Sequence, residues 1–176
     1  CLPKDVAALL STAREHECYL RIVSAVLEAN EYQKVRMVDK IRETLGDLNG
    51  KTIGILGLSF KPNTDDMREA QSVTIIRSLQ AEGAKIKAYD PAAMDNARKI
   101  LTDVQFCGGP SEVAEGSDAL VVLTEWNQFR KLDMGKIRAA LKSPIILDLR
   151  NIYEPDVMED LGFTYVAVGR RRLTFV

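Results

Sequence analysis

From Lys51 onward, short apolar runs rich in β-branched residues alternate regularly with segments of helical periodicity. The runs that we predict to be strands cover residues 52–58, 85–89, 104–107, 119–123, 145–148 and 164–168. Between them, helical spacing of apolar side chains occurs at residues 68–82, 92–101, 111–115, 134–141 and 155–161. Parallel strands need crossovers, which helices provide and which are nearly always right-handed. The alternation therefore predicts an α/β fold, a Rossmann-like parallel sheet with helices on both faces.

The N-terminal part of the chain has a helical pattern instead, from Pro3 to about Gly46. Apolar residues recur at helical spacing on both sides of a polar break at residues 15–17. A helix this long is unusual inside one compact core, so we expect it to link two domains or to pack against a second copy of itself. We divide the chain into a helical central or dimerisation region, residues 1–48, and a Rossmann-like domain, residues 49–176.

Composition excludes several classes of protein. The 24 Lys and Arg residues nearly balance the 25 Asp and Glu residues, and a formal charge of -1 argues against nucleic-acid binding. The longest apolar stretches are too short to cross a bilayer, so we expect no membrane segment. Three cysteines without C-x-x-C spacing and one histidine, His16, provide no zinc site. We predict a cytoplasmic, reduced and metal-free protein, in which His16 is a solvated helix residue.

The segment after the first predicted strand, residues 54–69, is the most informative. Ligands of open α/β sheets bind at the carboxyl ends of the strands, where this segment begins. It is not a G-x-G-x-x-G fingerprint, because Leu56 and Phe60 stand where glycines are expected. By itself it does not predict a bound dinucleotide.

The same segment carries charged residues suited to a phosphate. Lys61 and Arg68 flank the acidic pair Asp65 and Asp66 at the predicted start of a helix. Lys61 is suited to neutralise a phosphate with help from the helix amides, while the two acids cap the helix. The alternative is a polar loop with an ordinary helix cap.

Polar residues also follow later predicted strands. Asp90 ends the second strand, where an acid often accepts a hydrogen bond from a ribose hydroxyl, but it equally suits a turn or a cap before Pro91. Residues 124–126 and 148–151 follow the fourth and fifth predicted strands. Their position favours a ligand site, and their chemistry does not single them out.

The first five residues suggest a nucleophile. The thiol of Cys1 precedes a predicted helix start and lies near Lys4, an environment that stabilises a thiolate. Asp5 follows one helical turn later, where it is suited to orient or deprotonate a water. The alternative is that Cys1 is inert. We expect Cys18 and Cys107 to be buried, unreactive thiols.

Several motifs of this chain resemble those of the UDP-glucose/GDP-mannose dehydrogenase family, and within it the UDP-glucose 6-dehydrogenases. The match extends over the whole chain, and the order and spacing of the motifs are specific. The matching motifs are Cys-Leu-Pro-Lys-Asp at residues 1–5, Asn30-Glu31-x-Gln33, the run from Gly57 to Glu69, Tyr89-Asp90-Pro91, Thr124-Glu125-Trp126 and Asp148-x-Arg150-Asn151.

This resemblance implies an enzyme in three parts. An N-terminal Rossmann domain binds NAD, a long central helix supports a homodimer, and a second Rossmann-like domain binds the nucleotide of the sugar donor. The family oxidises the C6 alcohol of UDP-glucose to the acid in two hydride transfers, through a cysteine thiohemiacetal and then a thioester. This chain resembles the last two parts, so we expect it to be the C-terminal portion of such an enzyme, with residues 49–176 as the UDP-binding domain.

The resemblance also implies roles for single residues. Cys1 corresponds to the nucleophile, and Asp5 to the aspartate that activates or positions water. Lys4 and Arg68 correspond to residues near the NAD cofactor. The implied substrate ligands are Phe60 and Lys61.

Two positions depart from the family pattern. Gln71 stands where proline is more usual, and Leu149 where glycine is common. The resemblance assigns a chemical role to neither. The glycine-rich NAD-binding motif and the lysine and asparagine that precede the cysteine do not occur in the 176 residues, so we expect the isolated chain to be inactive.

Two alternatives remain open. A GDP-mannose or UDP-N-acetylmannosamine dehydrogenase belongs to the same family, and neither charge nor periodicity decides the base or the sugar. The isolated chain can also be interpreted as a non-catalytic nucleotide-binding and oligomerisation module.

Overall fold

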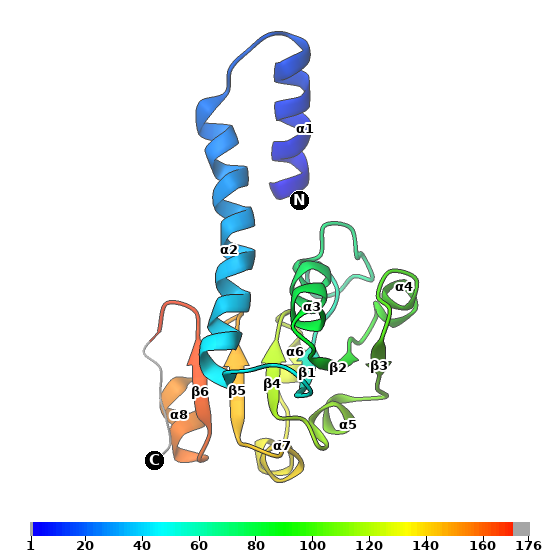
Figure 1. The fold of residues 1–176 in the computed structure, drawn as a ribbon, viewed down its shortest axis with the longest axis vertical. Helices are drawn as coiled ribbons and strands as arrows, with labels where there is room; N and C mark the ends of the chain where they lie inside the picture. Colours follow the sequence, from blue (N-terminus) through cyan, green and yellow to red (C-terminus); the bar gives the residue numbers. More distant parts are fainter. Residues whose placement is uncertain (1, 171–176) are drawn as a thin grey trace.

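The computed structural model describes the backbone of residues 2–170 and the side chains of residues 5–170. Figure 1 shows two parts in this range. A helical hairpin, formed by α1 and α2, rises from a lobe in which strands and helices alternate.

The lobe is built around a parallel sheet. The six strands of the described chain lie in the order β3-β2-β1-β4-β5-β6, and all neighbours are parallel. They are β1 (Thr52–Leu56), β2 (Lys85–Tyr89), β3 (Val104–Phe106), β4 (Ala119–Val122), β5 (Ile145–Asp148) and β6 (Thr164–Ala167). This is the strand order of dinucleotide-binding Rossmann folds. The predicted Rossmann-like α/β fold is confirmed.

The two faces of the sheet are covered by different helices. The helices of the lobe are α3 (Gln71–Ala81), α4 (Met94–Arg98), α5 (Pro110–Ala114), α6 (Asn127–Arg130), α7 (Met134–Ala140) and α8 (Pro155–Asp160). Ile53 and Ile55 of β1 enter a core cluster with α3 and α4, whereas Leu56 enters a second cluster with α5 to α8. Because β1 and β4 are covered on both faces, they form nearly unbroken apolar runs.

Helix α2 (Arg21–Leu45) covers the half of the first face that the crossovers leave open. Helices α3 and α4 connect β1 to β2 and β2 to β3, so they do not reach the β5 and β6 side. The second half of α2 buries Met37, Val38 and Ile41 in the cluster that contains Leu147 of β5 and Val166 of β6. The helix is therefore part of the core of the lobe.

The N-terminal helical segment is two helices and not one. Helix α1 (Leu2–Glu15) ends at the polar break, and α2 begins at Arg21 after a turn. Within the turn, Glu17 has a φ of 54°, which an uninterrupted helix excludes. Leu10 and Ala13 are buried in the hairpin, and α1 runs away from the lobe while α2 runs back towards it (Figure 1). The expectation of one long helix is wrong, because the polar break reverses the chain.

The two described cysteines lie in different environments. Cys18 is exposed in the turn between α1 and α2, where no layer covers it, so the expectation that it is buried is wrong. Cys107 is buried as expected, and burial raises the pKa of its thiol. Within the described range, no helix combines the length and hydropathy needed to cross a membrane, and no three potential metal-binding side chains cluster.

Candidate functional site

The chain leaves β1 through a turn that requires glycine. Gly57 has a φ of +92°, and a Cβ at this position would lie 2.5 Å from the Cβ of Thr124. The close approach brings the loop of residues 57–70 against the segment that follows β4. Strand β1 ends at Leu56, before the predicted end, because this turn begins there.

Asp90 organises the loop from the end of β2. Its Oδ2 accepts hydrogen bonds from the backbone N–H groups of Leu58 at 2.7 Å and Ser59 at 3.0 Å, and from Trp126 Nε1 at 3.1 Å. Its Oδ1 accepts from the backbone N–H groups of residues 92–93. Burial alone would raise the pKa of Asp90, but these donors prevail and hold that pKa below its ordinary value. Since both oxygens are occupied, the structure favours the turn and cap interpretation over ribose binding.

Asp148 has a similar role at the end of β5. It is fully buried and accepts from the N–H groups of Ile152 at 2.7 Å and Tyr153 at 2.9 Å, and from the Tyr165 hydroxyl at 2.8 Å. Burial, together with the hydrogen bond to Asp148, raises the pKa of Tyr165 far above its ordinary value, so the hydroxyl remains a donor. The aspartate of the Asp-x-Arg-Asn motif therefore holds its loop, and Arg150 remains partly exposed beside it.

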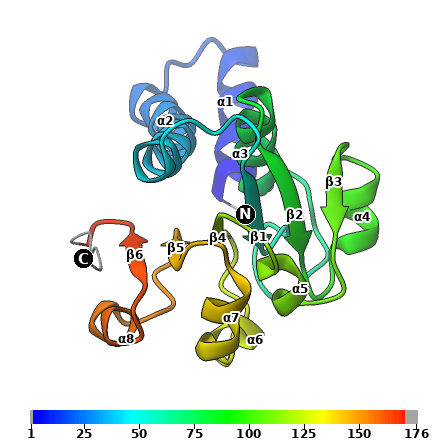
Figure 2. The same ribbon diagram turned by 60° about the horizontal axis from the view of Figure 1, so that its bottom comes forward.

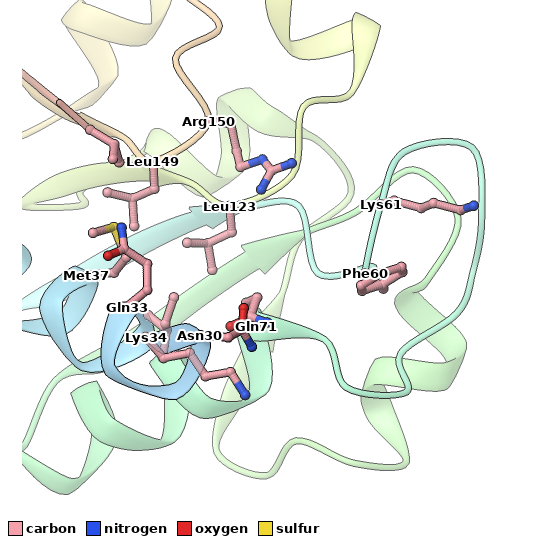
Figure 3. A pocket seen from close by; sticks show the side chains of 12 residues that line it. Asn30, Gln33, Lys34, Met37, Phe60, Lys61, Gln71, Leu123, Leu149 and Arg150 are labelled. Atoms are coloured by element: carbon pink, nitrogen blue, oxygen red, sulfur yellow. The ribbon is translucent and has the colours of Figure 1, made fainter. Parts of the chain in front are cut away.

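A cavity of about 500 Å³ opens at this edge of the sheet (Figure 3). Its volume lies in the range of small-molecule sites, about 300–1,000 Å³. Helix α2, the loop after β1, the first turns of α3 and the residues after β4, β5 and β6 form its wall. The lining residues are Asn30, Gln33, Lys34, Met37, Phe60, Lys61, Gln71, Ile75, Leu123, Leu149, Arg150 and Val168.

The polar part of the lining is cationic and rich in carboxamides. Three lining residues are Lys or Arg and three are Asn or Gln, and no carboxylate lines the cavity within the described chain. Lys34 Nζ pairs with Glu31 at 2.6 Å, and Arg150 Nε pairs with Glu125 at 2.5 Å. Lys61 is exposed and has no ion pair among the described residues. The cavity thus has one unpaired cation, which is suited to an anionic ligand.

The structure brings together residues that the sequence treated separately. The two predicted substrate ligands, Phe60 and Lys61, lie at one end of the cavity (Figure 3). Asn30 and Gln71 lie together where α2 meets α3, between Lys61 and the end of the cavity at Met37. The two departures from the family pattern, Gln71 and Leu149, therefore both line the site, although neither was assigned a role.

Lys34 is the lining cation that sequence reasoning missed. A lysine three residues after a glutamate on a helix is typical of a solvated face, yet only 9% of this side chain is exposed. It is buried because α2 lies against the lobe. No local sequence signal reports that packing.

Arg68 lies in a different hollow from Lys61. Its guanidinium contacts Asp66 at 2.7 Å, and 72% of its side chain is exposed. The hollow, of about 490 Å³, is lined by residues 64–68 together with Asn96, Lys99 and Ile100. Lys61, the predicted substrate ligand, and Arg68, the predicted cofactor contact, therefore lie in separate hollows of this lobe.

The predicted capping of α3 by the acidic pair is wrong. Helix α3 begins at Gln71, and its N-cap, Ala70, provides no side-chain hydrogen bond. Asp66 accepts hydrogen bonds from Arg68, and Asp65 accepts from Asn96. Asp66 therefore contacts a residue of its own loop and Asp65 a residue of α4, because the chain makes a further turn before α3 starts.

The predicted residues at the N-terminus are described only in part. Cys1 lies outside the described residues, and the side chain of Lys4 also lies outside them. Asp5 lies in the first turn of α1 and is exposed. The N-terminal end of α1 lies over the start of α3 in both views (Figures 1 and 2).

The described lobe does not fit NAD as dinucleotide-binding folds hold it. Those folds place the pyrophosphate at a glycine-rich turn that leads directly into a helix. Here residues 57–70 separate β1 from α3. Asp90, the position suited to a ribose, is saturated by protein donors.

Known proteins resemble this chain in sequence over almost its whole length. Residues 54–155 match the profile of the UDP-glucose/GDP-mannose dehydrogenase family, UDP binding domain. A UDP-glucose 6-dehydrogenase of Rhizobium meliloti is 42% identical over 171 residues, which cover 97% of this chain and 39% of that protein. The chain thus spans about two fifths of the length of the curated relatives that it matches.

Solved structures of nucleotide-sugar dehydrogenases are also similar to this chain. A UDP-glucose dehydrogenase of Pyrobaculum islandicum matches with a TM-score of 0.74 and 35% identity, over 84% of this chain and 33% of that one. An NDP-N-acetyl-D-galactosaminuronic acid dehydrogenase of Methanosarcina mazei matches with a TM-score of 0.83 and 25% identity, over 97% of this chain and 38% of that one. With a family profile that covers more than half of its residues, the chain belongs to the UDP-glucose/GDP-mannose dehydrogenase family, through the UDP binding domain.

Proposed function

We propose that this chain is the nucleotide-sugar-binding lobe and helical hairpin of an NAD-dependent UDP-glucose 6-dehydrogenase, which converts UDP-glucose to UDP-glucuronate. One observation carries the proposal. The segment that matches the UDP binding domain also delivers Lys61, the unpaired cation, to a cavity that no described carboxylate lines. A diphosphate is the part of UDP that such a cation attracts.

Glucose is the sugar that the relatives favour. The Rhizobium relative at 42% identity and the Pyrobaculum structure at 35% identity both have UDP-glucose in their names. The N-acetylgalactosaminuronic acid dehydrogenase is 25% identical. Because identity falls when the named sugar changes, we rank UDP-glucose ahead of UDP-N-acetylmannosamine and GDP-mannose as the substrate.

Lys61 and Phe60 are the proposed substrate ligands of this lobe. The ammonium of Lys61 binds the diphosphate, and the half-buried ring of Phe60 excludes water beside that ion pair. A charged hydrogen bond gains strength when water is excluded from it. The two neighbouring residues therefore act as one anchor.

The remaining assigned residues are proposed to act in the oxidation itself and in contacts with the cofactor, outside the cavity of this lobe. We propose Cys1 as the nucleophile and Asp5 as the residue that positions water. Lys4 and Arg68 are proposed to contact NAD, which supplies the hydride acceptor when it is bound. Because the lobe itself does not fit NAD, the cofactor belongs to another domain, and we expect the 176-residue chain to form no NADH from UDP-glucose.

Calorimetric titration of the chain with UDP tests the anchor. Lys61→Ala should weaken UDP binding by about tenfold to a hundredfold, the effect of losing a hydrogen bond to a charged group. Lys85→Ala is the matched control, because Lys85 is exposed at the opposite edge of the sheet, where β2 begins. Unchanged affinity in Lys61→Ala, or an equal loss in both variants, would contradict the proposal.

We also propose that residues 1–48 form a dimerisation region. The exposed large apolar residues of this region include Ile22 at 82%, Val26 at 40% and Tyr32 at 65%. Ile22 and Val26 are four residues apart and so share a face of the first turns of α2, before the turns that pack on the lobe, and Tyr32 is exposed further along the helix. Such a stripe suits burial against a second copy of the hairpin.

Analytical ultracentrifugation tests the dimer. Ile22→Glu should shift the chain from a dimer to a monomer, because a carboxylate would be buried at the interface. Val157→Glu is the control, since Val157 is an exposed apolar residue of α8 on the lobe. A wild-type chain that sediments as a monomer would overturn this part of the proposal.

A further inference from the structure

The cavity contains a buried donor that the protein does not satisfy. Asn30 Nδ2 is the single buried side-chain nitrogen or oxygen without a hydrogen-bond partner among the described residues. Leaving such a donor unpaired costs about 1–3 kcal/mol. Asn30 also lines the cavity, so a bound molecule can provide the missing acceptor after a rotation of the carboxamide.

A second carboxamide lies at the same end of the cavity. Gln71 is the first residue of α3, and its side chain makes no hydrogen bond with the described residues. Figure 3 shows Asn30 and Gln71 where α2 meets α3, with Lys61 at the far end. The cavity thus offers an unpaired cation at one end and, apart from it, two unpaired carboxamides where α2 meets α3.

We propose that Asn30 and Gln71 together bind the hydroxyl groups of the hexose and so select the sugar. A carboxamide both donates and accepts, which matches a hydroxyl and gives no advantage to a phosphate. This assignment rests on the proposed function, in which Lys61 binds the diphosphate. The sugar then lies where α2 meets α3, apart from Lys61.

The position of the N-terminal end of α1 indicates whether the carboxamide pair contacts the sugar or the base of the ligand. The proposed nucleophile precedes α1, and the N-terminal end of α1 lies over the start of α3, where Gln71 is found (Figures 1 and 2). The reacting sugar has to face that end. The uracil base therefore lies elsewhere, and the carboxamide pair contacts the hexose.

Titration of the full chain with UDP and with UDP-glucose tests this inference. In Asn30→Leu and in Gln71→Ala, the dissociation constant for UDP-glucose should rise by about threefold to tenfold, the loss of one neutral hydrogen bond. Affinity for UDP should change by less than about twofold, because the anchor at Lys61 is intact. The ratio of the two constants is the readout, since a merely structural defect would move both.

Gln105→Ala is the matched carboxamide control, because Gln105 is exposed on the edge strand β3. It should leave the ratio unchanged. An unchanged ratio in Asn30→Leu and Gln71→Ala, with UDP still bound through Lys61, would overturn the sugar assignment and leave the proposed function standing. An equal weakening of UDP and UDP-glucose would overturn it in favour of the base or phosphate. A chain that binds neither ligand contradicts both proposals.

Discussion

The carboxyl edge of the sheet contains two groups of polar side chains that the fold uses in opposite ways. Asp90 and Asp148 are at most 1% exposed, and their oxygens accept hydrogen bonds from backbone and ring donors. Asn30 and Gln71 line the cavity, and neither carboxamide nitrogen has a partner in the described chain. The aspartates hold the loops in place, and the carboxamides remain available.

Occurrence in a sequence motif is therefore not enough to identify a residue as ligand-binding. Asp90 and Asp148 stand in motifs at the ends of strands, where ligands bind, yet their hydrogen bonds are all internal. Gln71 belongs to no motif and faces the site. The hydrogen bonds that a side chain already makes are the better guide to what it can still bind.

Replacing Asp90 should have the largest effect on stability. Asp90→Ala leaves several buried N–H groups without an acceptor, so the free energy of unfolding should fall by about 3–5 kcal/mol. Urea denaturation followed by circular dichroism measures it, with the exposed Asp95→Ala as the control. A loss below about 1 kcal/mol, accompanied by weaker UDP binding, would move Asp90 into the ligand-binding group.

Removing one hydroxyl tests the second aspartate. Tyr165→Phe keeps the ring but removes the donor that lies 2.8 Å from Asp148, so the free energy of unfolding should fall by about 1–2 kcal/mol. Tyr32→Phe, on an exposed ring of α2, should change it by less than about 0.5 kcal/mol. Equal effects of the two substitutions would show that Asp148 does not depend on this donor.

Lowering the pH should reduce the stability that Asp90 contributes to the fold. The pKa of Asp90 in the folded chain lies below its ordinary value of 3.8, so its contribution to stability is present above that value and is lost as the pH falls through the folded pKa. The urea midpoint of the wild type should therefore drop between about pH 4 and pH 2. Asp90→Asn should show a shallower drop, and an identical pH dependence would contradict the assignment.

The smallest effect, and one of opposite direction, is expected at Asn30. Asn30→Leu removes an unpaired buried donor and keeps a similar shape, so the free energy of unfolding should stay constant or rise by up to about 1 kcal/mol. Thermal and urea unfolding measure it. A clear destabilisation would show that Asn30 serves the fold, as Asp90 does.

The strands were the most predictable part of the fold. Residues 85–89 and 145–148 were predicted as strands and form β2 and β5 with the same bounds. In β2 buried Ile86 and Ala88 alternate with more exposed residues, whereas β5 is a short apolar run, and each pattern is typical of a strand. Helix α6 (Asn127–Arg130) was not predicted, because a single turn carries no periodicity.

Only the part of the candidate site that comes directly after a strand in the sequence could be predicted. Lys61 comes after the first strand, where the rule that ligands bind at strand ends pointed to it, and its neighbour Phe60 was assigned through the family resemblance. Asn30 and Lys34 enter the site because α2 lies across the β5 and β6 side of the sheet, and Gln71 because α3 starts late. Both facts depend on contacts between residues far apart in the sequence.

Helix α2 belongs to both parts of the molecule. Its 25 residues form a rod about 37 Å long, whose inner turns are fixed in the core and whose outer turns stand clear of the lobe. Asn30 and Lys34 lie between these two ends and form the back wall of the cavity. A partner that binds the outer turns therefore contacts the same helix that forms the wall of the cavity.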